Sequence, residues 1–277
     1  MFPVKLPQLY LFVVVVIACQ MTVAQTTIPS PSHVVVVMEE NHSYSEIMGS
    51  SQAPYINTLA SVGAVFTHSY GVSHPSEPNY LALFSGSTHG VTTDNCPLTF
   101  SSGSLESQLL AASKTFKGYS EELPSVGSMV CSYHEYVRKH VPWTDFSTGK
   151  STDSLPFSYF PSSNFASLPT VSFVIPDLMD DMHDGSIQQG DAWLQQHLMN
   201  YVTWARNNNS LLIVTFDEDD FTTSNHILTL FVGSMVKPGK YTQTINHYNV
   251  LRTIEQMYKL PYLGKAATAT PITNVWK

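Results

Sequence analysis

The sequence predicts an α/β fold, in which buried strands and flanking helices alternate along the chain. Short apolar runs rich in valine, isoleucine and leucine recur, and such runs are typical of strands buried on both faces. Stretches with the apolar period of a helix lie between them. Because 43% of the residues are hydrophobic and 12% are charged, the composition excludes a disordered or fibrous chain.

The N-terminus is expected to be a secretory signal peptide covering residues 1–24. Lys5 precedes an apolar run at residues 9–18, which is shorter than the roughly 20 residues that a helix needs to cross a bilayer. Small residues around Ala24 suit cleavage after that position. We therefore expect a secreted protein with no stable membrane anchor, in which residues 25–277 form a single domain.

The strands are expected in the segments with the longest apolar runs. These are residues 33–38, 115–120, 170–175, 211–216 and 227–232, of which 115–120 has the weakest pattern.

Helices are expected after residues that commonly cap them. Asp191 precedes an apolar stripe that reaches Ala205, Asn246 precedes one that reaches Met257, and Ser104 opens a shorter helix. Residues 120–168 are rich in proline, serine and aromatic residues and have no clean period. They suit a long loop or lid over a site.

Cys96 and Cys131 are the two cysteines that would remain after signal-peptide removal, and in an oxidising compartment they are expected to form a disulfide. A metal site is a weaker alternative, because neither cysteine has a CxxC partner. The net charge of -8, from 13 Lys and Arg against 21 Asp and Glu, excludes a nucleic-acid partner bound through a basic patch.

Two of the expected strands end in acidic residues. Glu39, Glu40 and Asn41 follow the first strand, and Asp217 and Glu218 follow the strand at 211–216. Open α/β sheets place ligands at the carboxyl ends of their strands. If the two strands are neighbours, a ligand set for a divalent metal would form from Glu40, Asn41, Asp217 and Glu218; otherwise the two strand ends are solvated acidic turns.

The segment HPSEPNY places Ser76 directly before a helix whose first turn contains Pro78. Ser76 could simply cap that helix. A helix N-terminus also presents amides and a partial positive charge that suit a phosphoryl group. A hydroxyl there could attack phosphorus, and the Asn79 amide could donate to a phosphoryl oxygen.

Several segments, taken together and in order, resemble a known family. They are VVVVMEENHSY, SHPSEPNYLALFSGSTHG, the stretch from YSEELP to YVRKHVPW, VIPDLMDDMHDGSIQQGDAWL, VTFDEDD, LFVGSMVKPG and NHYNVLRTIEQMYKLPYLG. They are similar to the secreted phosphoesterase family of acid phosphatases and phosphatidylcholine-cleaving phospholipases C, a branch of the alkaline phosphatase superfamily. The resemblance implies an alkaline-phosphatase-like fold, with a central, mostly parallel sheet flanked by helices and a loop-rich lid.

The same resemblance implies roles for individual residues. Ser76 would be the nucleophile, Glu40, Asn41, Asp217 and Glu218 would hold a metal ion, and His74 and Asn79 would touch substrate. The DMHD segment offers Asp181, His183 and Asp184, which resemble the ligands of a second metal in sister families. His247 matches a late histidine of the superfamily, although it could equally be a helix residue without a catalytic role.

The implied reaction is a two-step displacement through a phosphoserine, with His74, His183 or His247 as proton donor. The oxygen-rich ligand set favours calcium, magnesium or manganese, whereas superfamily precedent favours zinc. A phosphomonoesterase (acid phosphatase) is preferred to a phospholipase C or other phosphodiesterase. The alternative from another class is a secreted protein that binds phosphate or a phosphorylated glycan without turnover.

Asn41 and Asn208 both lie in glycosylation sequons, NHS and NNS. A glycan on Asn41 would block the expected metal site. Modification is therefore expected at Asn208 only.

Overall fold

The computed structural model describes residues 1–4, 27–222 and 224–277. The expected signal peptide, residues 1–24, lies almost entirely outside the described residues and remains a prediction. Within the described part of the chain, no helix combines the length and apolar character needed to cross a bilayer.

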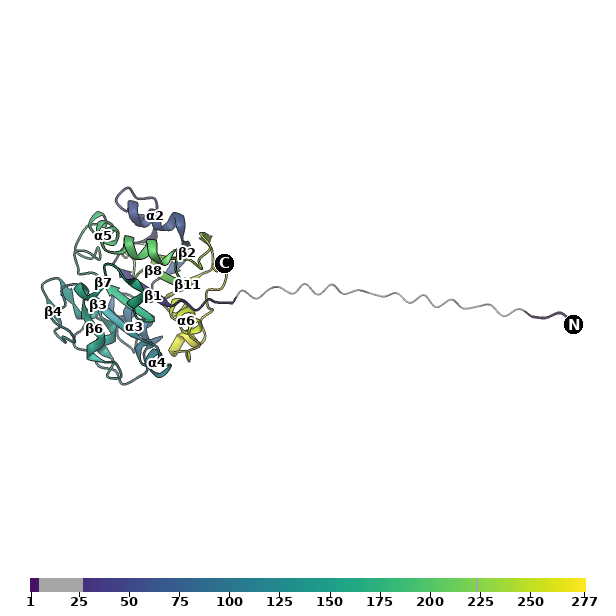
Figure 1. The fold of residues 1–277 in the computed structure, drawn as a ribbon, viewed down its shortest axis with the longest axis horizontal. Helices are drawn as coiled ribbons and strands as arrows, with labels where there is room; N and C mark the ends of the chain where they lie inside the picture. Colours follow the sequence, from purple (N-terminus) through teal and green to yellow (C-terminus); the bar gives the residue numbers. More distant parts are fainter. Residues whose placement is uncertain (5–26, 223) are drawn as a thin grey trace.

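A nine-stranded sheet forms the centre of the molecule (Figure 1). In spatial order its strands are β10 (Gly239–Tyr241), β2 (Ala64–Tyr70), β9 (His226–Gly233), β8 (Ser210–Phe216), β1 (His33–Glu39), β7 (Val171–Ile175), β3 (Phe116–Ser120) and β6 (Ser154–Pro156), while β11 (Ile245–Asn246) pairs with β2. The strands from β8 to β6 are parallel to one another, and β9 runs antiparallel to both β8 and β2. The predicted mostly parallel sheet is therefore confirmed.

All five predicted strands are present as β1, β3, β7, β8 and β9. The antiparallel direction of β9 fits the short connection from β8, because residues 217–222, 224 and 225 contain no helix and a parallel pair needs a longer crossover.

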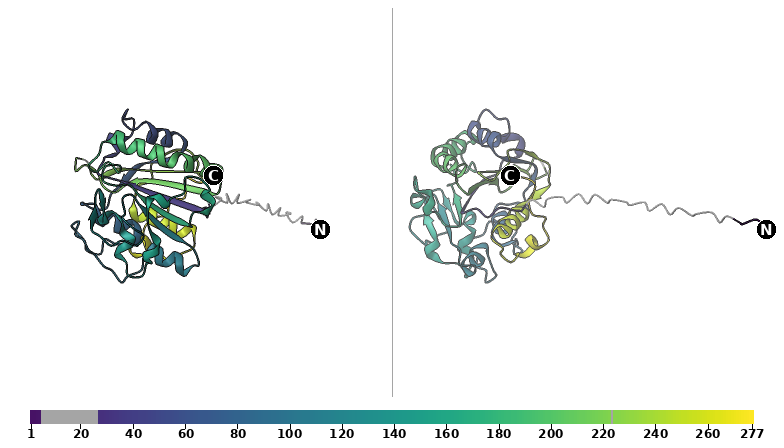
Figure 2. Two further views of the ribbon diagram at one scale, coloured as in Figure 1. Left: turned by 60° about the vertical axis from the view of Figure 1, so that its left-hand side comes forward. Right: turned by 45° about the vertical axis from the view of Figure 1, so that its right-hand side comes forward.

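Alternate residues of the central strands face two separate core layers, which Figure 2 shows as helices on both sides of the sheet. Val36 and Met38 of β1 face α3, α4 and α6, while Val35 and Val37 face α1, α2 and α5. The helices are α1 (Tyr44–Ile47), α2 (Pro54–Val62), α3 (Glu77–Ser85), α4 (Leu105–Ala111), α5 (Ile187–Ala205) and α6 (His247–Met257). Successive residues at the end of β1 therefore reach opposite faces of the sheet.

Two of the predicted caps are confirmed and one is wrong. Ser104 and Asn246 cap α4 and α6, each accepting a hydrogen bond from a backbone N–H of the first turn. The N-cap of α5 is Ser186, so Asp191 lies inside the helix. The Asp191 carboxylate instead accepts the N–H groups of Tyr55 and Ile56, at 2.9 and 2.7 Å, and so caps α2 from a distance.

The segment predicted as a lid is more ordered than a loop. It contains the hairpin of β4 (Ser132–Tyr133) and β5 (Tyr136–Val137), the edge strand β6 and the 3-10 turns Arg138–His140, Pro142–Asp145, Ser151–Asp153, Phe157–Tyr159 and Phe165–Ser167; a further 3-10 turn, Gly264–Ala267, follows α6. Arg138 is buried and donates to the Asp145 carboxylate at 2.9 Å, which anchors the segment internally.

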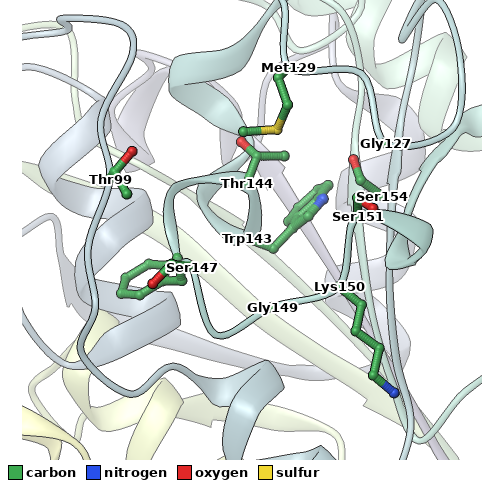
Figure 3. Close-up of a pocket in the computed structure, with 11 residues that line it drawn as sticks. Thr99, Gly127, Met129, Trp143, Thr144, Ser147, Gly149, Lys150, Ser151 and Ser154 are labelled. Carbon is green, nitrogen blue, oxygen red and sulfur yellow. The ribbon is translucent and has the colours of Figure 1, made fainter.

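The expected disulfide joins Cys96 to Cys131 across 35 positions of the chain and ties this segment to the stretch after α3. The segment also encloses a pocket of about 300 Å³, lined by Trp143, Met129 and Thr144 among others (Figure 3). None of the expected site residues lines this pocket.

Candidate active site

The two acidic strand ends meet at one edge of the sheet. Strands β1 and β8 are parallel neighbours with Glu39 paired to Phe216, so the residues that follow each strand lie side by side. The backbone N–H of Asn41 donates to Oδ1 of Asp217 at 3.1 Å. Asn41 itself has a φ of 56°, a left-handed conformation that asparagine tolerates better than most residues. The prediction that these strands are neighbours is confirmed.

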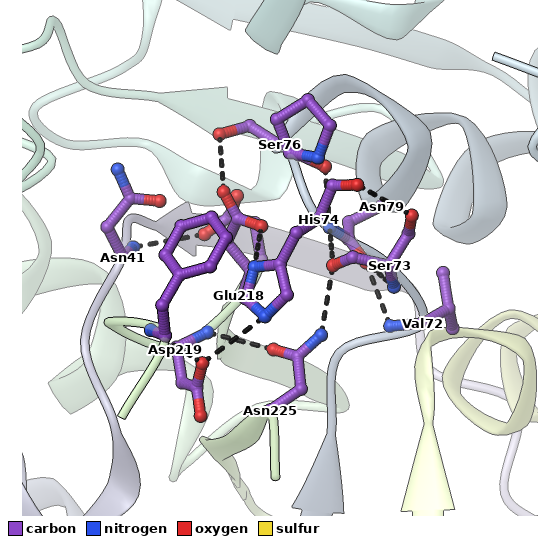
Figure 4. A network of polar contacts seen from close by, with 12 residues as sticks. Asn41, Val72, Ser73, His74, Ser76, Asn79, Glu218, Asp219 and Asn225 are labelled. Carbon is purple, nitrogen blue, oxygen red and sulfur yellow. Dashed lines mark hydrogen bonds and ion pairs between the residues drawn. The ribbon is translucent and has the colours of Figure 1, made fainter. Parts of the chain in front are cut away.

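Ser76 occupies the N-cap position of α3, but its side chain makes no capping hydrogen bond. The hydroxyl instead lies 3.0 Å from Oε2 of Glu40 and 3.3 Å from Oε1 of Glu218, and it can donate its one proton to either. Figure 4 shows Ser76 beside Glu218. The side chain is buried. Plain capping, the alternative explanation for this serine, is therefore wrong.

Asn79 has a different place from the one expected. Its Oδ1 accepts the N–H groups of Val72 and Ser73, at 2.8 and 3.1 Å, and its Nδ2 donates to the carbonyls of Ser73 and Pro75, at 2.9 and 3.2 Å. The amide is fully buried in the turn before α3. It holds the turn that presents Ser76 and is not turned toward a substrate.

The first amides of α3 are also less available than the sequence suggested. The Glu77 N–H donates to Asp94 at 3.0 Å, Pro78 has no N–H, and the Asn79 N–H donates to the Ser76 carbonyl at 2.8 Å. The helix N-terminus still contributes a partial positive charge. A phosphoryl group there would need other donors as well.

His74 lies on the open side of Ser76. Its Nδ1 contacts Oε2 of Glu218, its Nε2 lies 3.4 Å from Oδ1 of Asp219, and its ring stacks on Phe221 with centroids 3.9 Å apart. The side chain is 27% exposed, so solvent reaches the ring while two carboxylates hold it (Figure 4).

A third strand end brings Asp181 to the same site. The Asp181 carbonyl accepts the Glu40 N–H at 2.9 Å, and its carboxylate lies 3.3 Å from Nδ1 of His140. Nε2 of His140 lies 3.4 Å from Oε1 of Glu40, and one ligand atom from each of these residues falls within 4.8 Å of the others. Such a buried carboxylate–imidazole group is a candidate metal site.

Two further contributors come from α3 and the 3-10 turn Arg138–His140, and the sequence did not predict them. The Tyr80 hydroxyl donates to Oε1 of Glu40, and the Tyr80 ring stacks on His140 at 4.9 Å. Lys139 donates to Asp94 at 3.0 Å and lies 3.4 Å from Nε2 of His183. Lys139 and His140 belong to the YVRKHVPW stretch, which could have pointed to them.

The remaining expected residues lie at the margin or behind the site. His183 contacts Asp184 at 2.7 Å, and the Asp184 side chain is 51% exposed, away from the metal-binding group. The turn that follows β7 points Asp181 inward and leaves Asp184 in solvent. His247 is buried, and its Nε2 donates to the Asp217 carbonyl at 2.7 Å. Burial lowers the His247 pKa to about 4, so the ring is neutral at mildly acid pH and supports the backbone of Asp217.

The carboxyl groups crowd one another. Burial, followed by the charge of Glu218, raises the pKa of Asp217 to about 7. Burial is also the main cause that raises the pKa of Glu218 to about 7 and the pKa values of Glu40 and Asp181 well above their usual range. Burial lowers the pKa of Lys139, but its bond to Asp94 and the charge of Glu40 outweigh this effect and shift it upward.

The donor set fits a divalent cation. Within the part of the chain that the structure describes, Oδ1 of Asn41, Oδ2 of Asp217, Oδ2 of Asp181 and both ring nitrogens of His140 are buried and have no hydrogen-bond partner. Buried polar atoms normally have hydrogen-bond partners, so such a concentration of unpartnered donors at one point fits the binding of a metal ion. Clustered carboxylates with one imidazole are suitable donors for a metal ion.

Comparisons with known proteins agree on the chemical class. The model of the Phosphoesterase family matches residues 50–261. A phosphatidylinositol-3-phosphatase of Mycobacterium tuberculosis is 54% identical over 259 residues, which are 93% of this chain and 87% of that protein. An acid phosphatase of Aspergillus fumigatus is 31% identical over 246 residues, 82% of this chain and 54% of that protein. The chain thus spans about half the length of this fungal relative.

Solved structures share the fold. A protein of the alkaline phosphatase superfamily from Vibrio parahaemolyticus matches 90% of this chain and 72% of its own, with a TM-score of 0.60 and 12% identity. The lipoteichoic acid synthase LtaP of Listeria monocytogenes matches 90% of this chain and 77% of its own, with a TM-score of 0.61 and 10% identity. The predicted superfamily fold is therefore confirmed.

Proposed function

We propose that this chain, which belongs to the Phosphoesterase family and is a phosphoric ester hydrolase, is a secreted, metal-dependent phosphatase that hydrolyses phosphomonoesters through a phosphoserine at Ser76. One observation carries the proposal: the Ser76 hydroxyl lies 3.0 Å from Glu40 and 3.3 Å from Glu218, residues that come from distant parts of the chain. Either carboxylate can accept the Ser76 proton as the serine oxygen attacks phosphorus. A binding protein without turnover would not need this arrangement.

The metal ion would be held by Glu40, Asn41, Asp217 and Glu218 next to Ser76, with His140 and Asp181 as further donors. The unpartnered buried atoms described above support this assignment. When bound, the cation would supply the charge neutralisation that lets a phosphate dianion enter an acidic site. Two unit charges about 4 Å apart repel by roughly 4 kcal/mol near a protein surface, so the bare carboxylates would exclude substrate.

The chain's own residues account for the displacement. The Ser76 oxygen forms a bond to phosphorus and passes its proton to Glu218 or Glu40 as the bond from phosphorus to the leaving alcohol oxygen breaks. Lys139, which the structure pairs with Asp94, is the cation that we assign to the phosphoryl oxygens. Water then attacks the phosphoserine, which releases phosphate and restores the Ser76 hydroxyl.

His74 is the best-placed proton donor for the leaving alcohol. Both of its ring nitrogens face carboxylate oxygens, its ring reaches solvent, and Glu218 connects it to Ser76. His183 sits further out beside Lys139, at 3.4 Å. We therefore assign His74 as general acid in preference to His183 and His247.

A monoester substrate is supported by the names of the relatives, which are phosphatases. The mycobacterial relative is named for a phosphoinositide, and the fungal relatives are acid phosphatases. Rates on p-nitrophenyl phosphate, bis-p-nitrophenyl phosphate and phosphatidylcholine should fall in that order. A higher rate on the diester or the lipid would favour a phospholipase C or another phosphodiesterase.

The decisive variant is Ser76→Ala, which removes the nucleophile and leaves the turn intact. Activity on p-nitrophenyl phosphate should fall by about a thousandfold or more, because no covalent intermediate can form. Ser73→Ala is the matched control, since the Ser73 hydroxyl donates only to the adjacent His74 carbonyl at 3.1 Å. Equal rates for Ser76→Ala and the unmodified protein would exclude this mechanism.

Metal dependence is tested by dialysis against a chelator, followed by separate addition of calcium, magnesium, manganese and zinc salts. Activity should be lost on dialysis and should return when one of these metal salts is added. The disulfide supports the proposed secretion, because such bonds persist in oxidising compartments. Glycosylation at Asn208 remains a prediction.

A further inference from the structure

A second group of carboxylates lies close to the site of Ser76 but shares no residue with it. Glu121 follows β3, and Asp177 and Asp180 lie in the turn that follows β7. One oxygen from each of the three carboxylates falls within 4.8 Å of the others. Three like charges at this separation repel one another unless something neutralises them.

Neighbouring donors hold these carboxylates in place without supplying a full positive charge. The indole N–H of Trp193 and the N–H of Asp177 donate to Glu121 at 3.0 and 3.2 Å. The N–H of Asp180 donates to Asp177 at 3.0 Å, and the amide of Gln189 donates to Asp180 at 2.9 Å. Across residues 27–222 and 224–277, no lysine, arginine or histidine forms an ion pair with any of the three.

Glu39 provides an independent sign that a ligand belongs here. Its side chain is 0% exposed, and neither carboxylate oxygen has a hydrogen-bond partner among the described residues. It lies on the same face of the sheet as Glu121, because Val37 and Tyr119, each two positions earlier in its strand, line one core layer. Burial is the main cause that raises the pKa of Glu39, followed by the charges of Asp181, Asp180, Asp191 and Glu121, so Glu39 lies between the Ser76 site and the second group of carboxylates. An unpaired buried carboxylate is costly, and a cation would remove that cost.

We propose that Glu121, Asp177 and Asp180, backed by Glu39, bind a calcium ion. All the donors are oxygens, with no imidazole or thiolate, which favours a hard cation over zinc. Calcium also accepts an irregular set of carboxylates completed by water. Glu39 adjoins Glu40, and Asp180 adjoins Asp181, so the bound ion would fix the two backbone turns that lead into the site of Ser76.

Terbium luminescence tests the site directly, because Tb³⁺ replaces Ca²⁺ and is sensitised by a nearby indole. Trp193 donates to Glu121, one of the proposed ligands, so excitation of tryptophan should give terbium emission that added Ca²⁺ abolishes. The double variant Glu121→Gln with Asp177→Asn should lose this emission, and its calcium affinity should fall by at least about 10- to 100-fold. The variant Glu40→Gln, altered in the site of Ser76, should retain it.

Glu122→Gln is the matched control, because Glu122 is exposed on the same turn and, among the described residues, its carboxylate accepts the Glu135 N–H alone, at 2.7 Å. It should bind terbium like the unmodified protein. Trp193→Phe should lose the sensitised emission but should still bind calcium in calorimetry. Emission that survives in the Glu121→Gln, Asp177→Asn variant and disappears in Glu40→Gln would place the ion at the other site and overturn the proposal.

Thermal unfolding gives a second readout that does not depend on activity. Calcium should raise the melting temperature of the unmodified protein, because a ligand that binds only the folded state stabilises it. In a chelator, the double variant should be at least as stable as the unmodified protein, since it carries fewer like charges. A double variant that is less stable in chelator and equally stabilised by calcium would show that the carboxylates are structural and would overturn the proposal.

Discussion

Tyr80 fixes the position of one of the two carboxylates that face the Ser76 hydroxyl. It is fully buried in α3, one turn after Ser76, and its hydroxyl donates to Oε1 of Glu40 while Ser76 approaches Oε2. Each oxygen of Glu40 therefore has its own protein contact. This arrangement leaves the carboxylate little freedom to rotate.

Replacing Tyr80 with phenylalanine should reduce activity by about 10- to 100-fold, the usual effect of removing a group that orients a metal ligand. The chelator concentration that halves activity should also fall, because a freely rotating Glu40 binds metal less well. Tyr136→Phe is a suitable control: its hydroxyl is buried with no hydrogen-bond partner among the described residues, so activity should be retained. Identical activity in Tyr80→Phe would show that Glu40 does not depend on this contact.

At the level of single residues, the sequence predicts the strand-end carboxylates better than the groups that surround them. Glu40, Asn41, Asp217 and Glu218 follow apolar strands, so sheet topology alone brings them together. Asn79 lies in the turn before α3, as expected. Its side-chain contacts depend on the backbone conformation of that turn, which the sequence pattern does not predict. Lys139 and His140 come from a segment without a period, so only the YVRKHVPW stretch, and no secondary-structure pattern, could have pointed to them.

The turn before α3 is the element that presents the nucleophile, and the Asn79 side chain holds it together. Asn79→Ala would leave the N–H groups of Val72 and Ser73 and the carbonyl of Pro75 without these partners. We expect a loss of about 2–4 kcal/mol in the free energy of unfolding, measured with urea, because buried unsatisfied groups are costly. Activity should fall with it.

The control for this variant is Asn207→Ala, at the end of α5. Asn207 is exposed, and its side chain donates to the Thr203 carbonyl at 2.8 Å at the surface, so little stability should be lost. The stability of Asn79→Asp should lie between those of Asn79→Ala and Asn207→Ala. Aspartate can still accept the N–H groups of Val72 and Ser73, but it cannot donate to the carbonyls of Ser73 and Pro75. A stable Asn79→Ala variant would mean that the turn is held by other contacts.

At the level of elements, the buried parallel strands were predictable because an unbroken apolar run indicates a strand that is buried on both faces of the sheet. The missed strand β2 mixes Thr67 and His68 into its sequence, so its pattern is weaker. The predicted start of α5 was wrong because Asp191 was assigned as the cap of that helix. Asp191 does cap a helix, but the helix is α2, which lies far from it in sequence. Local patterns cannot reveal a cap supplied by a distant helix.

For the whole molecule, buried carboxyl groups should make stability depend on pH. Glu255 is fully buried, Oε1 accepts the Leu263 N–H at 2.8 Å, and Oε2 has no partner within the described residues. Burial raises the pKa of Glu255 to about 8, despite the opposing effects of that hydrogen bond and Arg252. The unfolded chain ionises near the ordinary glutamate pKa of about 4.3.

The folded state therefore holds a proton that the unfolded state releases over this interval. The contribution of Glu255 to stability should be complete below about pH 4 and should decline by up to about 1.4 kcal/mol per pH unit until about pH 8. Glu255→Gln keeps the acceptor and removes the charge, so its stability relative to the unmodified protein should rise between pH 5 and 8. Urea unfolding of both proteins in chelator measures this difference, and parallel curves would contradict it.

Glu39 and Glu40 are adjacent in the chain, yet one faces the α5 side of the sheet and the other faces α3. A single peptide unit thus separates the two acidic groups. Deleting one residue from the end of this strand would exchange the sides to which the two carboxylates point. A shift of one position would therefore disrupt both acidic groups at once. A substitution at Glu39 or Glu40 alters one of the two acidic groups, whereas a change in spacing alters both.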